Sequence, residues 1–149
     1  MSDGQKSGLV GQSVKRVEDD RLLRGKGQYV ADITPEGCLH AAFVRSPFAH
    51  AEINGIDIRA AKRLKGVVEV YTGDDIKRLT NPFLPIGVSR GLYVPLFWGL
   101  ATDRARLVGD PVALVIATSR AIAEDACELV EVDYDLLPGV ATIDQALSD

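Results

Sequence analysis

Arg45, Ser46 and His50 are the side chains whose types and spacing most directly suggest catalysis. A serine four residues before a histidine could be a nucleophile with its general base, the pair that hydrolases use in acyl transfer. Such a pair also needs an orienting carboxylate and an oxyanion hole, and the nearby acids Glu52 and Asp57 have no spacing that singles either out. We therefore expect Ser46 and His50 to hydrogen-bond backbone groups at a turn. A hydrolase is the alternative.

Three other patterns could indicate a catalytic, phosphate-binding or metal-binding site, and none of them meets the requirements of such a site. The acids Glu131, Asp133 and Asp135 alternate along the chain, which predicts the solvent face of one strand rather than a paired-carboxylate site. Gly25 and Gly27 belong to no phosphate-binding pattern, so we expect them to shape a turn. The sequence has two cysteines and two histidines, too few and too isolated for an iron–sulfur cluster or a structural zinc site.

Composition excludes several classes of partner. The net charge of −4 offers no basic field for a polyanion, so we expect no nucleic-acid partner. The longest strongly apolar run, Val112–Ala117, is too short to span a bilayer. The first residues, MSDGQKSG, lack the charged and apolar regions of a secretion signal. We expect a cytoplasmic protein.

The elements that must position these side chains follow from periodicity and from end signals. Pro47 ends a strand, Asn54-Gly55 predicts a bulge or turn, and Asp57, Thr72, Ser119 and Thr142 are expected helix caps. The expected strands cover 28–33, 38–46, 51–58, 67–72, 112–118 (a central strand) and 130–135; the expected helices cover 59–65, 73–79, 120–130 and a short stretch after Thr142.

These elements do not strictly alternate, which favours an α+β domain with a mixed sheet and short flanking helices. We expect a flexible tail over residues 1–10 and one domain over 11–149.

Residues 81–100 break the pattern. This stretch contains three prolines, three glycines and four of the chain's nine aromatic residues, so it is too interrupted for a helix and too apolar for a solvated linker. It could pack on its own core or on another domain. The residues we expect at such an interface are Arg45, Phe83, Tyr93, Phe97 and Trp98.

Four motifs in order carry a resemblance to a known family: RSP-x-AHA from Arg45, GVV-x-V-x-TG-x-DI from Gly66, VGDPVA-x-V-x-A from Val108 and V-x-VDY-x-x-LP from Val130. Together they resemble the N-terminal α/β-hammerhead domain of the molybdenum hydroxylase large subunits, which include xanthine dehydrogenase, aldehyde oxidase and carbon monoxide dehydrogenase. The resemblance covers nearly the whole chain.

The resemblance implies a part of an oxidoreductase that oxidises an aldehyde, an N-heterocycle or carbon monoxide. Such enzymes use a molybdenum–pterin cofactor, two [2Fe–2S] clusters and FAD. The pterin-binding loops and the catalytic glutamate lie downstream of the hammerhead domain in this family, beyond the point that corresponds to Asp149. We therefore expect no catalytic, cofactor-binding or metal residue in this chain, and no activity of the chain alone.

Two functions follow as hypotheses. The first is a structural domain or small subunit that docks on a molybdopterin-binding domain or subunit, with Fe–S and FAD subunits as further partners. The alternative is a free-standing binding or scaffold module that has the hammerhead fold and no redox role.

Overall fold

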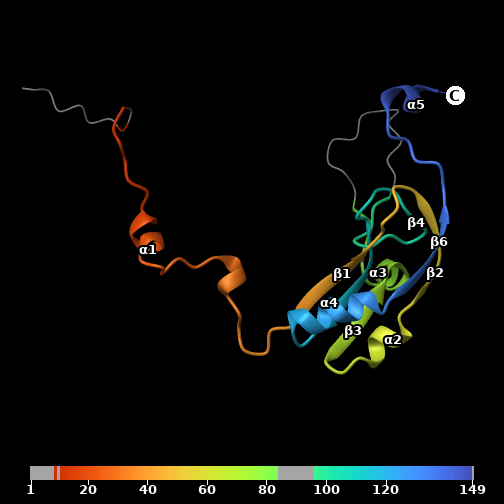
Figure 1. Ribbon diagram of the computed structural model, residues 1–149, viewed down its shortest axis with the longest axis horizontal. Coiled ribbons are helices and arrows are strands. Elements are labelled where there is room, and N and C mark those ends of the chain that lie inside the picture. Colours follow the sequence, from red (N-terminus) through yellow and green to blue (C-terminus); the bar gives the residue numbers. More distant parts are fainter. Residues whose placement is uncertain (1–8, 10, 84–95, 149) are drawn as a thin grey trace, which may run out of the picture. The chain divides into compact units, whose positions relative to one another are not determined.

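The computed structural model describes residues 9, 11–83 and 96–148, and the chain divides into two units, Met1–Gly37 and Cys38–Asp149. The first unit contains α1 (Asp19–Leu23) and a 3-10 helix, η1 (Val30–Asp32), and none of its described residues is buried. The tail expected over residues 1–10 falls almost entirely outside the described residues. The second unit contains the strands and the other helices (Figure 1).

The strand expected over residues 28–33 is wrong, because Val30–Asp32 forms η1. The carboxylate of Asp32 accepts the backbone N–H of Tyr29 at 2.9 Å and closes a capping box. A short-range bond of this kind competes with strand pairing, which needs a distant partner.

One sheet of the second unit has the strand order β1-β5-β3, formed by His40–Arg45, Pro111–Ala117 and Val67–Thr72. Both pairings are antiparallel, and Phe43 lies opposite Leu114. The central place of β5 confirms the expectation from its continuous apolar run, since a strand that is apolar on both faces is typical of a sheet interior.

The second sheet has the order β4-β2-β6, formed by Arg104–Ala105, Ala51–Asp57 and Glu131–Leu136, again antiparallel throughout. The register of β2 against β6 shifts between Ile53 and Gly55, which confirms the bulge expected at Asn54-Gly55.

The α+β class is confirmed, whereas the single mixed sheet is replaced by two antiparallel sheets. In β6 the acidic side chains are exposed, whereas Val132 and Tyr134 are partly buried, which is typical of a strand with one solvent face.

Three of the four helices described in this unit begin after the caps that the sequence predicts. Helix α4 (Arg120–Glu128) lies across β1 and β5, and its Ser119 cap accepts the N–H of Ile122 (Figure 1). The expected capping boxes are present at α3 (Gly73–Leu79) and α5 (Ile143–Leu147). Helix α2 (Arg59–Arg63) has Ile58 as its N-cap, one residue after the expected Asp57. The Asp57 carboxylate still accepts the backbone N–H of Arg59 at 2.9 Å.

The core lies between α4, α2 and the inner faces of the strands. Its buried side chains are small, which allows the helix and the sheet to approach closely. They are Ala61, Val70, Ala113, Val115, Ala117, Ala123, Ala126 and Val130. Among the residues described, no helix has both the length and the apolar content to cross a membrane.

Candidate functional site

Ser46 is placed where it cannot act as a nucleophile. It is 2% exposed, and its Oγ accepts the N–H of Phe48 and donates to the Phe48 carbonyl, both at 3.1 Å. None of its hydrogen bonds reaches His50. The expectation that Ser46 serves the turn after β1 is confirmed.

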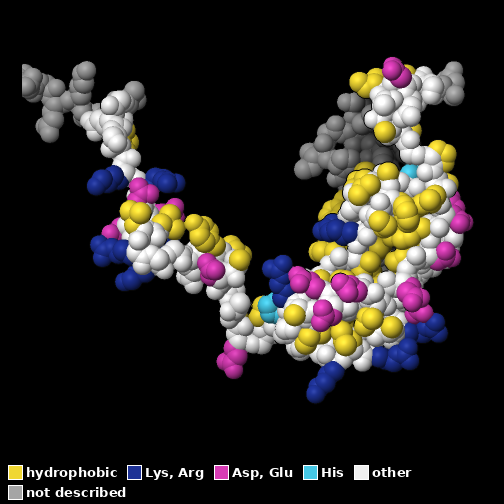
Figure 2. Space-filling model, viewed as in Figure 1, with side chains coloured by type: hydrophobic (Ala, Val, Ile, Leu, Met, Phe, Trp, Pro, Cys, Tyr) yellow, Lys and Arg dark blue, Asp and Glu magenta, His cyan; other side chains and the backbone are white. Residues whose placement is uncertain are grey.

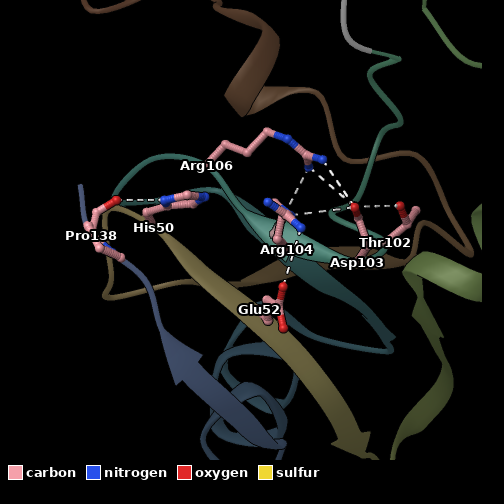
Figure 3. A network of polar contacts seen from close by, with 7 residues as sticks. All are labelled: His50, Glu52, Thr102, Asp103, Arg104, Arg106 and Pro138. Carbon is pink, nitrogen blue, oxygen red and sulfur yellow. Dashed lines mark hydrogen bonds and ion pairs between the residues drawn. The ribbon is translucent and has the colours of Figure 1, made fainter. Parts of the chain in front are cut away.

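His50 is held by the chain after β6. Its Nδ1 lies 2.8 Å from the carbonyl oxygen of Pro138, and the N–H of Leu137 donates to the His50 carbonyl at 3.0 Å. Because a carbonyl only accepts, this bond requires a proton on Nδ1, so in the neutral imidazole Nε2 is an acceptor. In Figure 3 the ring lies between Pro138 and the arginines, with its second nitrogen on the side away from Pro138. His50 therefore bonds a backbone group, as expected.

The turn between β4 and β5 is fastened to the end of β1. The N–H of Ser46 donates to the Asp110 carbonyl at 2.9 Å, and the N–H of Gly109 donates to the Ser46 carbonyl at 2.8 Å. Arg45 donates from Nη1 to the Gly109 carbonyl at 2.8 Å. Gly109 has φ +88°, a conformation that favours glycine. The motifs from Arg45 and from Val108 are thus locked together.

Two arginines beside His50 are paired within the chain (Figure 3). Arg106 Nη2 lies 3.2 Å from Asp103 Oδ2, and Arg104 Nη2 lies 3.3 Å from Glu52 Oε1. Burial acts to raise the pKa of Asp103, but the charge and hydrogen bonds of Arg106 outweigh it and hold that pKa below its usual value. Asp103 Oδ2 also lies 3.7 Å from Arg104 Nε, so the two guanidinium groups are balanced by two carboxylates, Glu52 and Asp103.

A hollow of about 920 Å³ opens where these segments meet, and we call it the His50 hollow. Its walls come from residues 49–50, 103–104, 106–108 and 139–141. Three aliphatic side chains at its edge are mostly exposed: Leu107 at 56%, Val108 at 65% and Val140 at 67%. Figure 2 shows apolar side chains gathered on this part of the surface, around β4.

The expected interface residues divide into three groups. Phe83 and Phe97 are exposed, and the N–H of Phe83 donates to the Phe97 carbonyl. Trp98 is half-buried beside them in sequence, and Tyr93 lies outside the described residues. Arg45 is exposed, but its guanidinium is engaged by Gly109 and lies 5.4 Å from the centre of the Phe43 ring. An interface role for these residues is still a prediction.

The other candidates do not form a site. Glu131, Asp133 and Asp135 are exposed at alternate positions of β6, as expected for a solvent face. Within the described ranges, no group of three or more histidine, cysteine or acidic side chains could hold a metal ion. Cys38 is exposed and Cys127 is half-buried.

The sequence also contains a GxSxG pattern, GVSRG at residues 87–91, which lies outside the described residues. A nucleophile elbow places its serine between a strand and a helix. The surrounding segment, rich in proline and glycine, predicts neither.

Sequence analysis placed Val108 in a family motif, but it predicted no surface role for Leu107, Val108 or Val140. One signal was available, because an apolar pair directly before a Gly-Asp turn is unusual in a solvated loop. Nothing in the sequence placed Val140 near that pair. The described arrangement can bind an apolar group, and Ser46, its candidate nucleophile, is buried and hydrogen-bonded to the backbone.

The chain matches the family described as aldehyde oxidase and xanthine dehydrogenase, a/b hammerhead domain, over residues 24–138. It is 46% identical over 129 residues to the nicotine 6-hydroxylase large subunit of Paenarthrobacter nicotinovorans, covering 87% of this chain and 16% of that protein.

Two solved structures have the same fold. Quinoline 2-oxidoreductase from Pseudomonas putida 86 matches with a TM-score of 0.86 and 46% identity, over 92% of this chain and 17% of that one. The Cu,Mo-CO dehydrogenase matches with a TM-score of 0.78 and 40% identity, again over 92% and 17%. The chain thus spans about a sixth of the length of these relatives.

Proposed function

Since the chain belongs to the aldehyde oxidase and xanthine dehydrogenase hammerhead-domain family, we propose that it is a structural docking part of a molybdenum-cofactor hydroxylase. In this proposal it performs no chemistry by itself and binds the molybdopterin-binding part of the enzyme. The oxidation of an aldehyde, an N-heterocycle or carbon monoxide then belongs to the assembled enzyme.

One observation carries the proposal: the polar groups of the motif residues hold the motifs to one another. Arg45 and Ser46 bond the turn at Gly109 and Asp110, and His50 bonds the Pro138 carbonyl. Side chains that bind backbone groups in this way keep elements in register and are not available to a substrate. The same region exposes three aliphatic side chains, Leu107, Val108 and Val140, beside its paired charges, which favours docking on another protein surface.

The iron–sulfur cluster that the family implies does not fit the described residues. A [2Fe–2S] cluster takes four cysteine or histidine ligands that lie close together. The two cysteines and two histidines of the chain form no such group within the described residues: Cys38 is exposed, Cys127 is half-buried against the core, and His50 bonds the Pro138 carbonyl. Acidic side chains add none either, since no group of three or more histidine, cysteine or acidic residues among those described could hold a metal ion. We therefore place the molybdenum–pterin group, the [2Fe–2S] clusters and FAD on other parts of the assembled enzyme.

Trp98 provides the test, because it is the single tryptophan of the chain and lies next to Phe97. We expect a tagged chain to co-purify with a molybdenum-containing polypeptide from its own cells. Emission from Trp98 should move to shorter wavelength on assembly, and acrylamide should quench it less. The purified chain alone should contain no molybdenum and oxidise none of the substrate classes.

Phe97→Ser should weaken this association, whereas Val68→Ser on β3 is the control, since Phe97 is 48% and Val68 52% exposed. Removing an aromatic anchor from an interface commonly costs about 2 kcal/mol of binding free energy or more. A monomer that never associates with a molybdenum-containing polypeptide would refute the docking role. If aldehydes or heterocycles then raised its melting temperature, the free-standing binding module would replace it.

A further inference from the structure

We propose that the His50 hollow receives an uncharged, apolar polypeptide segment from the part of the assembled oxidoreductase that lies outside residues 1–149. This inference rests on the proposed docking function and names the chemistry of one contact. Four features of the hollow carry it: its rigid edge, its paired charges, its free acceptor and its continuity with the aromatic surface.

The apolar edge of the hollow is held rigid before any partner binds. Leu107 and Val108 occupy a turn whose backbone is bonded at Arg106, Gly109 and Asp110. The N–H of Arg106 donates to the Asp110 carboxylate at 2.9 Å, and the N–H of Asp110 donates to the Leu107 carbonyl at 3.2 Å. A rigid turn loses little conformational entropy when it is covered, so its exposed aliphatic side chains favour association.

The charges of the hollow favour an uncharged occupant. Arg106 is paired with Asp103, and Arg104 with Glu52. A charged occupant would have to leave water and compete with a carboxylate that each arginine already holds. An apolar occupant meets neither cost.

Among the described residues, Nε2 of His50 has no hydrogen-bond partner. The Pro138 carbonyl takes the proton on Nδ1, so in the neutral imidazole Nε2 presents its lone pair. The occupant should therefore donate there, and a backbone N–H of an extended segment suffices. The contact would orient the segment without adding charge.

The hollow continues into the surface expected to dock. A smaller hollow lined by Leu96, Phe97 and Trp98 shares Arg106 and Leu107 with it. The matched relatives are about six times as long as the region they share with this chain, so their subunits contain ample polypeptide to cover both hollows. Leu107 and Arg106 therefore connect the hollow lined by Phe97 and Trp98 to the His50 hollow.

Cysteine labelling in the assembled protein tests the contact directly. Val108→Cys is made in a Cys38→Ser, Cys127→Ala background and labelled with N-ethylmaleimide, alone and in the molybdenum-containing assembly. We expect assembly to slow labelling at least about tenfold, as burial of the side chain requires. Val68→Cys is the matched control, since Val68 is 52% exposed on β3, and its labelling should change less than about twofold.

Charge substitutions test the chemistry of the occupant. Val108→Asp and Val108→Lys should each reduce the assembled fraction at least about tenfold, while Val108→Ile and Val68→Asp should leave it within about twofold. Unchanged circular dichroism and melting temperature would show that each variant folds, as expected for a side chain so exposed.

The outcomes separate this inference from the docking role itself. If the assembly forms and Val108→Cys labels as fast as in the free chain, the segment does not occupy the hollow and only this inference fails. If either Val108→Asp or Val108→Lys still assembled normally, the occupant would be charged, and this inference would also be overturned. If Val108→Cys labels slowly in the isolated chain and that chain forms a dimer, a second copy of the chain occupies the hollow and this inference fails. If no molybdenum-containing assembly forms, both proposals fail.

Discussion

Gly73 gives the sharpest test of the packing that supports the site. It begins α3 within the motif from Gly66, and it is buried. A Cβ at this position would lie 2.2 Å from the carbonyl oxygen of Ala101 and 2.8 Å from Cα of Thr102. Both are backbone atoms, so no side chain can rotate away. Gly73→Ala should therefore destabilise the fold through a steric clash.

The magnitude follows from how firmly the opposing segment is held. The N–H of Ala101 donates to the Pro111 carbonyl at 2.7 Å, and the N–H of Ile53 donates to the Asp103 carbonyl at 2.9 Å. An ordinary contact would require a shift of about 1 Å against these bonds, and overpacking of this kind costs about 3 kcal/mol at the upper end of its usual range. The melting temperature should fall by about 10 °C.

Urea unfolding followed by circular dichroism measures this cost, and Gly55→Ala is the matched control. A Cβ added at Gly55 would meet no heavy atom within 4 Å beyond its chain neighbours, and the backbone there does not need a positive φ. The replacement should change the free energy of unfolding by less than about 1 kcal/mol, with a small gain from reduced unfolded-state entropy. If Gly73→Ala unfolds within about 0.5 kcal/mol of the parent chain, the close approach of α3 to residues 101–102 is refuted.

The remaining predictions concern Asp57, the thiols of Cys38 and Cys127, and Arg45, whose side chain bonds the turn at Gly109. The hydrogen bond from Arg59 lowers the pKa of Asp57 to about 2. The ionised carboxylate of Asp57 therefore contributes fully to stability above its unfolded pKa, and this contribution is lost as the pH falls from about 4 toward 2. Asp57→Asn should make the melting temperature depend less on pH between pH 7 and pH 2.5. Burial raises the pKa of the Cys127 thiol, so iodoacetamide at pH 8 should modify exposed Cys38 first, and equal rates would contradict the burial. Arg45→Gln should lower the free energy of unfolding by about 1 kcal/mol and speed hydrogen exchange in the turn that its side chain holds; unchanged exchange would show that the turn stands alone.

Local sequence signals determined most of the secondary structure. The Thr72 and Thr142 capping boxes, the Ser119 cap and the continuous apolar run of β5 each depend on residues a few positions apart. Their physical cause is local, since a cap satisfies a backbone N–H within the same turn. The four motifs were likewise visible without coordinates, and the match over residues 24–138 confirms the family that they indicated.

The tertiary structure alone decided which residues meet. Arg45 reaches a carbonyl 64 positions away and His50 one 88 positions away, and no period or cap encodes such a distance. Sequence patterns likewise predicted one mixed sheet where the structure has two antiparallel sheets. Which strands pair depends on which of their faces are buried together, and that is decided by distant parts of the chain. Ser46 and His50 looked like a nucleophile and its base because both are polar and close in sequence. The fold gives each a backbone partner and puts apolar Val108 and Val140 at the edge of the hollow beside His50.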